Sequence, residues 1–545
     1  MTTAMETQRP LVNLDNLGSG VTKKLPEAIC KFIDAAQTAT GRSSFYNTKE
    51  EQDKAMQDIH RDLFVLDRGL YSLCLLLPGL LDQTKRHGLG MLLDNPPVGT
   101  ESSLVDPTVE SRIIAKLSNT LPPQRLLKMF EQFRRERVNN SRTKRLILRS
   151  ILCSENFGDF WAIKYRYKLR RALEHAWSKR VTSILRSILG KRFTKNKTSL
   201  TGKEGAILRD KILRFVHPGR DLLVLECVAF ILGHEEELSL PLLKAYVEAK
   251  KDFTKAKGIP LSNLMYLRGR FHLDKVTKAQ VYELAKGQMT ETEKSLTHKS
   301  TKKEGVEVSF DPEKIEATKL YIYLYEMAET LTKDARKKID AALKRKGEEA
   351  ARKLLATHKN VGVVLDLSQS MMGSETQKLR PLATSLACID MLEASVRMRD
   401  GTLSLEVTGV GSRKADLPIP CGDTSLAEAL VTVLKKKPEI VYVLSDGYEN
   451  APAGRFAEVI NALRKMGNET PIVQIVPVLA AESKGVRHLS DKILALPLNK
   501  PEALATSMLK NVLMTDLRTG LLGIVETAAK QLSGPKTPAL EVKNG

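Results

Sequence analysis

Five side chains with hydroxyl or carboxylate oxygens follow the ends of apolar segments in the last third of the chain. Asp366, Ser368 and Ser370 come at alternate positions after the run VGVVL, so an extended turn would bring their oxygens to one point. Thr424 in CGDTSL and Asp446 in VLSDGYEN are two later positions of the same kind. Oxygen ligands with few carboxylates suit a hard divalent ion such as Mg, Mn or Ca. None of the five offers a thiol or an imidazole, which disfavours zinc.

The segment after His358 must supply the elements that position these oxygens. It alternates apolar runs with helical patterns, and runs of Val, Ile and Leu without polar alternation are typical of strands buried on both faces. We predict a doubly wound parallel sheet whose ligand lies at the carboxyl ends of the strands. The predicted strands are 361–368, 402–410, 439–446, 471–479 and 492–498, and the predicted helices are 376–397, 424–436, 453–467 and one beginning at Pro501.

This arrangement resembles the metal-ion-dependent adhesion site of von Willebrand factor type A domains. The pattern of that site is D-x-S-x-S followed by a Thr and an Asp on two later loops, and all three parts occur here in order. The resemblance implies a site that binds the carboxylate of a partner and does no chemistry. In the alternative, Ser368 and Ser370 cap the next helix and Asp446 is an ordinary loop acid.

Common catalytic patterns are missing from the sequence. It contains no G-x-S-x-G, no G-x-x-x-x-G-K-[ST] and no H-E-x-x-H, which mark a nucleophile elbow, a phosphate loop and a zinc protease. Ser368 with His358 or His488 would be a nucleophile and a base, but Ser368 already belongs to the metal pattern. We therefore expect that the protein is not an enzyme.

Cysteine usage and the N-terminus indicate the compartment. The six cysteines are scattered without a C-x-x-C pair, and the N-terminus lacks an apolar signal segment. Apolar stretches such as 70–81 are interrupted and too short to span a bilayer. We expect a cytoplasmic protein without a membrane partner.

The excess of positive charge is confined to one part of the chain. The sequence has 86 Lys and Arg against 64 Asp and Glu, a formal charge of +22. Residues 361–545 are nearly neutral at +1, whereas residues 131–220 hold 24 bases and 7 acids, net +17. A solvated surface usually mixes its signs, so this segment favours a polyanionic partner. In the alternative, the surface is basic only for solubility.

The part of the chain before the sheet has the pattern of packed helices. Apolar residues recur at helical spacing from about Lys23 to Leu355, with breaks at Gly and Pro. Stacked helical hairpins would pack such helices economically, which predicts a HEAT-like helical repeat. Helices are predicted at 121–138, 142–153, 159–190, 205–219 and 222–234.

Bases at helical spacing predict an RNA-binding surface within this part. On one helix through 160–181, steps of three and four residues place five bases on one face, and Trp161 and Tyr165 lie on a core-facing side. The turn at 191–202 and the helix after it add more bases. Nothing here reads base edges, so single strands and RNA shape are better targets than duplex sequence. The predicted RNA-binding residues are Lys164, Lys168, Arg171, His175, Lys179, Lys191, Arg192, Lys195, Lys197, Arg209 and Arg214.

Together these features resemble the Ro autoantigen family, in which a basic helical TROVE module precedes a von Willebrand factor type A domain. KLRRALEHAWSKR (168–180) and LRDKILRFVHPG (208–219) are similar to two helices of that module, while the segment 31–51 keeps Gly41 and Tyr46 but lacks the usual run of glycines. The resemblance implies a ring of helical hairpins with a positively charged hole that takes the single-stranded 3′ end of misfolded RNA. It also implies a small noncoding, Y-like RNA on the outer surface. Arg209, eight residues before His217, falls where the family has a polar RNA-contacting residue.

The predicted organisation is a tail at 1–22, a TROVE-like helical domain at 23–357, a von Willebrand factor type A-like domain at 358–530 and a tail at 531–545. The predicted function is a monomeric ribonucleoprotein scaffold in RNA quality control, with an RNA-processing protein as a further partner at the metal site. Two other functions remain open. One is a protein-binding adaptor for an ATPase or another protein, and the other is a nuclease, against which the basic part lacks clustered acids.

Overall fold

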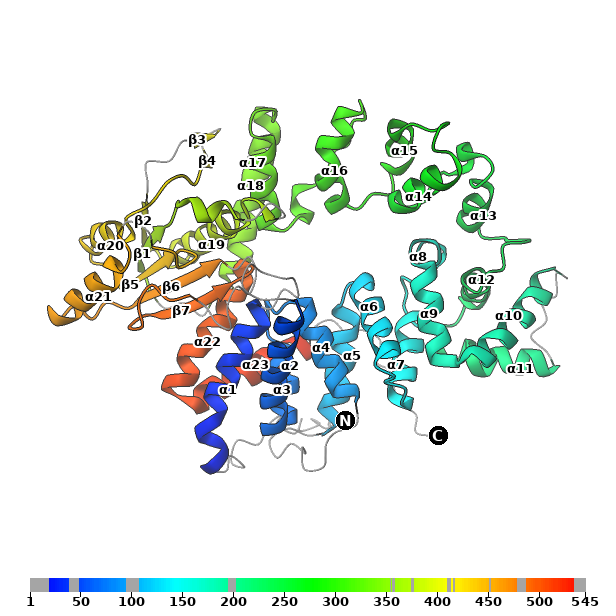
Figure 1. The fold of residues 1–545 in the computed structure, drawn as a ribbon, viewed down its shortest axis with the longest axis horizontal. Helices are drawn as coiled ribbons and strands as arrows, with labels where there is room; N and C mark the ends of the chain where they lie inside the picture. The colour runs from blue at the N-terminus through cyan, green and yellow to red at the C-terminus, as the bar shows by residue number, and fades with distance from the viewer. Residues whose placement is uncertain are drawn as a thin grey trace, which may run out of the picture. The chain divides into compact units, whose positions relative to one another are not determined.

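The computed structural model is mostly helical, with a five-stranded parallel sheet in its C-terminal part, which agrees with the predicted combination of an α part and an α/β part (Figure 1). Its contacts form two compact units. This grouping differs from the predicted domain limits, which follow composition along the chain rather than contacts. The first unit comprises Met1–Gly88, Pro96–Leu117 and Ile315–Gly545, and the second comprises Leu89–Asn95 and Ser118–Lys314. The structure describes residues 19–38, 49–94, 107–194, 202–352, 354, 358–373, 377–408, 413–414, 417–449, 452–477 and 487–533.

The sheet of the first unit has its chain order reversed at one point. All neighbouring strands are parallel, and β1 lies between β2 and β5, which follow it along the chain in that order. At such a reversal the connections leave in opposite directions, so a crevice opens beyond the carboxyl ends of the two central strands. In order across the sheet, the strands are β2 (Thr402–Val407), β1 (Asn360–Leu365), β5 (Ile440–Leu444), β6 (Ile472–Pro477) and β7 (Leu494–Leu498).

Helices cover both faces of this sheet. On one face Val441 and Val443 of β5 pack in one apolar cluster with Leu430 of α20 (Leu426–Leu434) and Phe456 of α21 (Arg455–Lys465). Successive strand side chains alternate between faces, so Tyr442 points to the other face, where α19 (Arg380–Arg397) packs on β1 and β6. The apolar runs of β1, β5, β6 and β7 are therefore largely buried on both sides, as the sequence predicted. The same prediction is wrong for β2, in which every residue is exposed or half-buried and Leu405 and Val407 are 39% and 38% exposed.

The first unit also joins the two ends of the chain. In Figure 1, α22 (Leu504–Thr515, red) lies beside α1 (Ser19–Thr38, blue). Between them Lys510 Nζ lies 2.6 Å from Asp34 Oδ1, and Ser507 Oγ donates to Gln37 Oε1 at 3.0 Å. Asn499 Nδ2 donates to the carbonyl of Gln37 at 3.2 Å. We call these five residues the α1–α22 junction.

Several other helices complete the first unit or lie at its limits. α3 packs against α23, and α17 and α18 pack against α19. Residues of α4 and α5 belong to both units. Their bounds are α2 (Lys49–Leu66), α3 (Arg68–Cys74), α4 (Asp82–Leu93), α5 (Pro107–Thr120), α17 (Ala317–Met327), α18 (Lys333–Ala351) and α23 (Leu517–Ser533).

The second unit is helical throughout its described residues apart from its turns. The apolar faces of its helices bury large side chains such as Phe130, Phe157 and Phe230. Its helices are α6 (Pro123–Arg135), α7 (Ser141–Leu152), α8 (Asp159–Lys164), α9 (Arg166–Trp177), α10 (Lys179–Thr194), α11 (Gly202–Lys211), α12 (Asp221–Ile231), α13 (Pro241–Glu248), α14 (Leu261–Phe271), α15 (Lys278–Ala285) and α16 (Glu291–Lys303).

The prediction of one continuous helix over 159–190 is wrong. The chain leaves helical geometry at Tyr165 (φ −121°, ψ 17°) and at Ser178 (φ 77°, ψ 157°). Next to each break a side chain bonds to a distant backbone carbonyl: Arg166 Nη2 donates to Phe230 O at 2.7 Å, and Trp177 Nε1 donates to Lys211 O at 3.2 Å. These tertiary bonds accompany three short helices in place of the one that the local pattern favours.

Replacing Gly79 by Ala should destabilise the first unit at its junction with the C-terminal helices. A Cβ at Gly79 would lie 2.3 Å from Ala503 Cβ, and the residue has φ +77°. We expect a loss of about 1–2 kcal/mol from the positive φ and a further 1–3 kcal/mol, roughly, from overpacking, measured by urea unfolding. Gly219→Ala is the matched control, because its φ is +84° and the space around it is open. Equal losses in the two variants would contradict a close approach at Gly79.

Candidate cation site and candidate nucleic-acid interface

The carboxylate of Asp366 is the buried centre of the oxygen-rich site. Asp366 follows β1 and is 0% exposed. Its Oδ1 accepts from the Ser368 amide at 2.8 Å and from Thr424 Oγ1 at 3.0 Å, and its Oδ2 accepts from Ser445 Oγ at 2.7 Å. Hydrogen bonds to an ionised carboxylate are short and strong, so these three donors fix both oxygens. The site lies at the reversal of strand order, because the register pairs Leu365 of β1 with Leu444 of β5.

The two serines of the pattern lie together, and Ser368 makes no side-chain capping bond to the described residues that follow it. Ser368 Oγ and Ser370 Oγ are 2.9 Å apart. Ser368 is the residue before a short 3-10 turn, yet its side chain makes no capping bond there, and α19 begins after Leu379. The Gln369 amide donates to Gly422 O at 3.1 Å, which connects this loop to the loop that carries Thr424. The structure thus brings four of the five predicted oxygen-bearing residues into one hydrogen-bonded group.

Asp446 is connected to the hydrogen-bonded group around Asp366 through the adjacent Ser445. The hydroxyl of Ser445 accepts from the Gly447 amide at 3.1 Å while it donates to Asp366, and Asp446 Oδ1 accepts from the Tyr448 amide at 3.2 Å. Gly447 has φ +87°, and a Cβ there would lie 2.7 Å from Arg487 Cβ, so the turn after Asp446 requires glycine. Sequence reasoning missed Ser445, whose signal was a hydroxyl at the end of a buried apolar strand.

The donor chemistry fits a hard divalent cation. Within the residues that the structure describes, no three His, Cys, Asp or Glu side chains gather as a metal cluster. A cation here would therefore depend on the hydroxyls of Ser368, Ser370 and Thr424 together with the carboxylates of Asp366 and Asp446. Such a mixed oxygen set with few charges suits an ion that keeps some of its water ligands.

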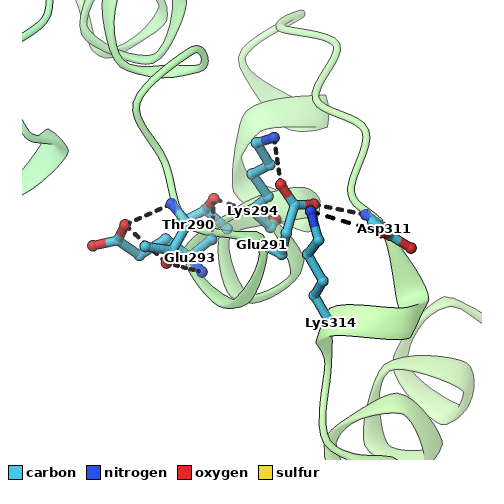
Figure 2. Close-up of polar contacts among 7 residues, drawn as sticks. Thr290, Glu291, Glu293, Lys294, Asp311 and Lys314 are labelled. Atoms are coloured by element: carbon cyan, nitrogen blue, oxygen red, sulfur yellow. Dashed lines mark hydrogen bonds and ion pairs between the residues drawn. The ribbon is translucent and has the colours of Figure 1, made fainter. Parts of the chain in front are cut away.

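Lys164, the first of the predicted RNA-binding bases, has an intramolecular role. Its Nζ lies 3.2 Å from Glu293 Oε1, and its side chain is 11% exposed. Figure 2 shows Glu293 turned back onto Thr290 at the start of α16, where the two residues form a reciprocal capping box. The neighbouring Glu291 bonds to Lys294 and to the Asp311 amide. Lys164 thus joins α8 to a capped helix start.

Two further predicted bases on α9 are engaged within the second unit. Arg171 Nη1 lies 3.0 Å from Glu131 Oε1, and its guanidinium lies 4.2 Å from the centre of the Tyr167 ring. His175 Nε2 is 3.0 Å from the carbonyl of Val138, and burial lowers the pKa of His175 below its ordinary value. The predicted face of five cations on one helix is therefore wrong: the five lie on three helices, and His175 is largely neutral near pH 7.

The remaining predicted bases divide into exposed, paired and undescribed residues. Lys168 and Lys179 are exposed and form no ion pair with any described side chain; Arg180, which sequence reasoning missed, is equally exposed beside Lys179. Lys191 lies 3.5 Å from Glu204, and Arg214 lies 3.1 Å from Asp210 and over the Phe215 ring. Arg209 is exposed at the end of α11. The Arg192 side chain, Lys195 and Lys197 lie outside the described residues, as do Gly41 and Tyr46 of the segment 31–51.

No protein-family model, no curated protein and no solved structure matches the chain. Among the described helices, none is long and apolar enough to cross a membrane.

Replacing Lys164 should cost stability, whereas replacing Lys168 should not. Lys164→Ala removes a mostly buried partner of Glu293, so we expect a loss of about 1 kcal/mol, between the values for exposed and buried pairs. Lys168→Ala removes an exposed side chain and should change the free energy of unfolding by less than about 0.5 kcal/mol. Chemical denaturation of both variants measures the difference. Equal changes would contradict the structural role of Lys164.

Proposed function

We propose that the chain is an RNA-binding ribonucleoprotein scaffold of the cytoplasm, which binds small noncoding, Y-like RNA and the single-stranded 3′ ends of misfolded RNA. The observation that carries the proposal is the group of exposed bases Lys168, Lys179 and Arg180 on α9 and α10, inside the segment with net charge +17. Exposed bases without acidic partners are the side chains that can release counterions from a phosphate backbone. The resemblance to the Ro autoantigen family supports RNA quality control as the setting.

We also propose two finer features of the fold. First, the helices form a HEAT-like ring; second, the sheet is a von Willebrand factor type A domain. The resemblance to the Ro autoantigen family supports the first part. The strand order and the oxygen-rich site at its reversal support the second part.

Replacing the exposed bases should weaken RNA binding and its dependence on salt. We expect Lys168, Lys179 and Arg180, changed together to Ala, to reduce affinity for a hairpin RNA with a single-stranded 3′ tail. Each lost phosphate contact on a single strand lowers the slope of log K against log salt by about 0.7, so the triple variant should lose about 2 in slope. Filter binding between about 50 and 300 mM KCl, a range over which the screening of charges increases, measures the affinity and its slope against salt.

The matched control replaces three exposed lysines of the sheet part, Lys435, Lys436 and Lys465, by Ala. It should leave the affinity and the slope unchanged. A blunt hairpin without the tail should bind more weakly than the tailed one, because the proposed hole admits one strand. If both triple variants lose equal affinity, the assigned surface is wrong, and if tailed and blunt RNA bind equally, the threading of a 3′ end is wrong.

A second candidate function is protein binding. In this function the oxygen-rich site binds an RNA-processing protein, an ATPase or another partner. The observation that favours it is the convergence of Asp366, Ser368, Ser370 and Thr424 in the nearly neutral part of the chain. That part has little electrostatic attraction for phosphate. Adhesion-type binding of a partner carboxylate should respond to a chelator, whereas RNA binding should respond mainly to salt.

Removing two ligands should abolish stabilisation by a divalent ion without affecting RNA. A ligand that binds only the native state raises stability by about 2.7 kcal/mol at 100 times its dissociation constant, so Mn²⁺ or Mg²⁺ should raise the melting temperature of the wild type. Asp366→Ala with Ser368→Ala should lose this rise, and Ser370→Ala, a milder change, should reduce it. An undiminished rise in both variants would mean that the pattern does not bind the ion.

A further inference from the structure

Ser445 is a buried hydroxyl that the five-residue pattern does not include. It follows β5 and is 0% exposed. Its amide donates to Ile475 O at 3.1 Å, which holds the backbone against β6. Its Oγ donates to Asp366 Oδ2 at 2.7 Å and accepts from the Gly447 amide at 3.1 Å. One side chain thus contacts the loop after β1 and the turn that carries Asp446.

The two bonds of Ser445 fix the direction of its hydroxyl. A serine hydroxyl has one proton and two lone pairs. Here the proton is committed to Asp366, and one lone pair is committed to the Gly447 amide. Because the residue is wholly buried and its backbone is bonded to β6, the hydroxyl has no exposed alternative partner. The side chain therefore acts as a fixed link between Asp366 and the Asp446 turn.

The orientation that Ser445 gives to the Asp366 carboxylate affects whether the Thr424 hydroxyl can bind a cation. A hydroxyl offers its lone pairs to a cation only when its proton points elsewhere, and the proton of Thr424 goes to Asp366 Oδ1. Oδ1 faces Thr424 only while the carboxylate keeps its orientation, which the bond from Ser445 to Oδ2 maintains. Without Ser445, Oδ1 would keep its bonds from the Ser368 amide and Thr424, but Oδ2 would lose the Ser445 donor. The carboxylate would then be held from one side only, and its terminal torsion, which is broad in energy, would be less restricted.

We propose that Ser445 is the positioning residue of the cation site, which orients the Asp366 carboxylate and sets its place relative to Asp446. The proposal rests on the proposed cation site. Ser445 acts through its bonds with Asp366 and with the Gly447 amide. Partners of metal ligands that orient them typically change metal affinity by about 10- to 100-fold when they are removed.

The test uses the full-length chain and Mn²⁺ alone, with the free ion measured by electron paramagnetic resonance. Ser445→Ala should raise the dissociation constant for Mn²⁺ by about 10- to 100-fold, and the metal-free variant should keep the circular dichroism spectrum of the wild type. Ser445→Cys keeps an unbranched side chain with a donor at the same position, although it is larger and makes weaker hydrogen bonds, so it should give an intermediate constant. If Ser445→Ala does not fold, Ser445→Cys carries the test alone.

Two controls separate positioning from general packing and from failure of the site itself. Ser385→Ala removes another wholly buried hydroxyl, on α19, and should leave the Mn²⁺ constant unchanged. Ser370→Ala removes a proposed ligand and should weaken binding. If Ser370→Ala weakens binding while both Ser445 variants stay within about twofold of the wild type, which is less than the expected effect, the positioning role is wrong and the site stands. If the wild type binds no Mn²⁺, the site and the role of Ser445 are both wrong.

Discussion

The α1–α22 junction is the constraint on which the remaining architecture depends. It joins Asp34 to Lys510, a half-buried pair 476 residues apart, and beside this pair the buried Gln37 accepts hydrogen bonds from Ser507 and Asn499. Burial raises the pKa of Asp34, and the nearby Lys510 only partly offsets that effect. A pair of this kind contributes little net stability, but separating its members would leave a charge without a partner. The junction therefore specifies which segments meet, and α1 becomes a neighbour of both α22 and β7. The sheet that carries the oxygen-rich site is in this way packed against helices from the start of the chain.

The apolar patterns sufficed to predict the sheet and the place of the oxygen-bearing residues at its edge, because both depend on local features. The binding of a metal ion by these residues stays a prediction. Continuous runs such as 439–446 identify strands buried on both faces, and polar residues directly after them must lie at the carboxyl edge. Asp366 and Thr424 accordingly meet at 3.0 Å. Ser445 was not singled out, because a serine after a strand carries no distinctive spacing. Its importance comes from contacts with Asp366 and Gly447 that only the folded chain makes.

The basic surface was harder to predict, because the exposure of each basic side chain depends on partners that are distant in sequence. Helical spacing places Lys164 and Lys168 on one face, yet Lys164 pairs with Glu293, 129 residues later, and Lys168 remains exposed. Arg166 and Trp177 bond to residues of other helices where α9 begins and ends, and the predicted long helix is divided there. Charge density along the chain thus locates the basic segment, but the fold decides which of its bases remain available to a phosphate backbone. Lys168, Lys179 and Arg180 are exposed among the described residues, and the sheet part is nearly neutral.

Crosslinking the intact protein to RNA in cells, and identifying both the RNA and the crosslinked peptides, tests the central claim most directly. The account predicts recovery of small structured noncoding RNA and of RNA with single-stranded 3′ ends. It also predicts that the crosslinked peptides fall within α9 to α11, which contain Lys168, Lys179 and Arg209. Recovery of no RNA above the background of an uncrosslinked sample would contradict an RNA scaffold and favour the protein-binding adaptor.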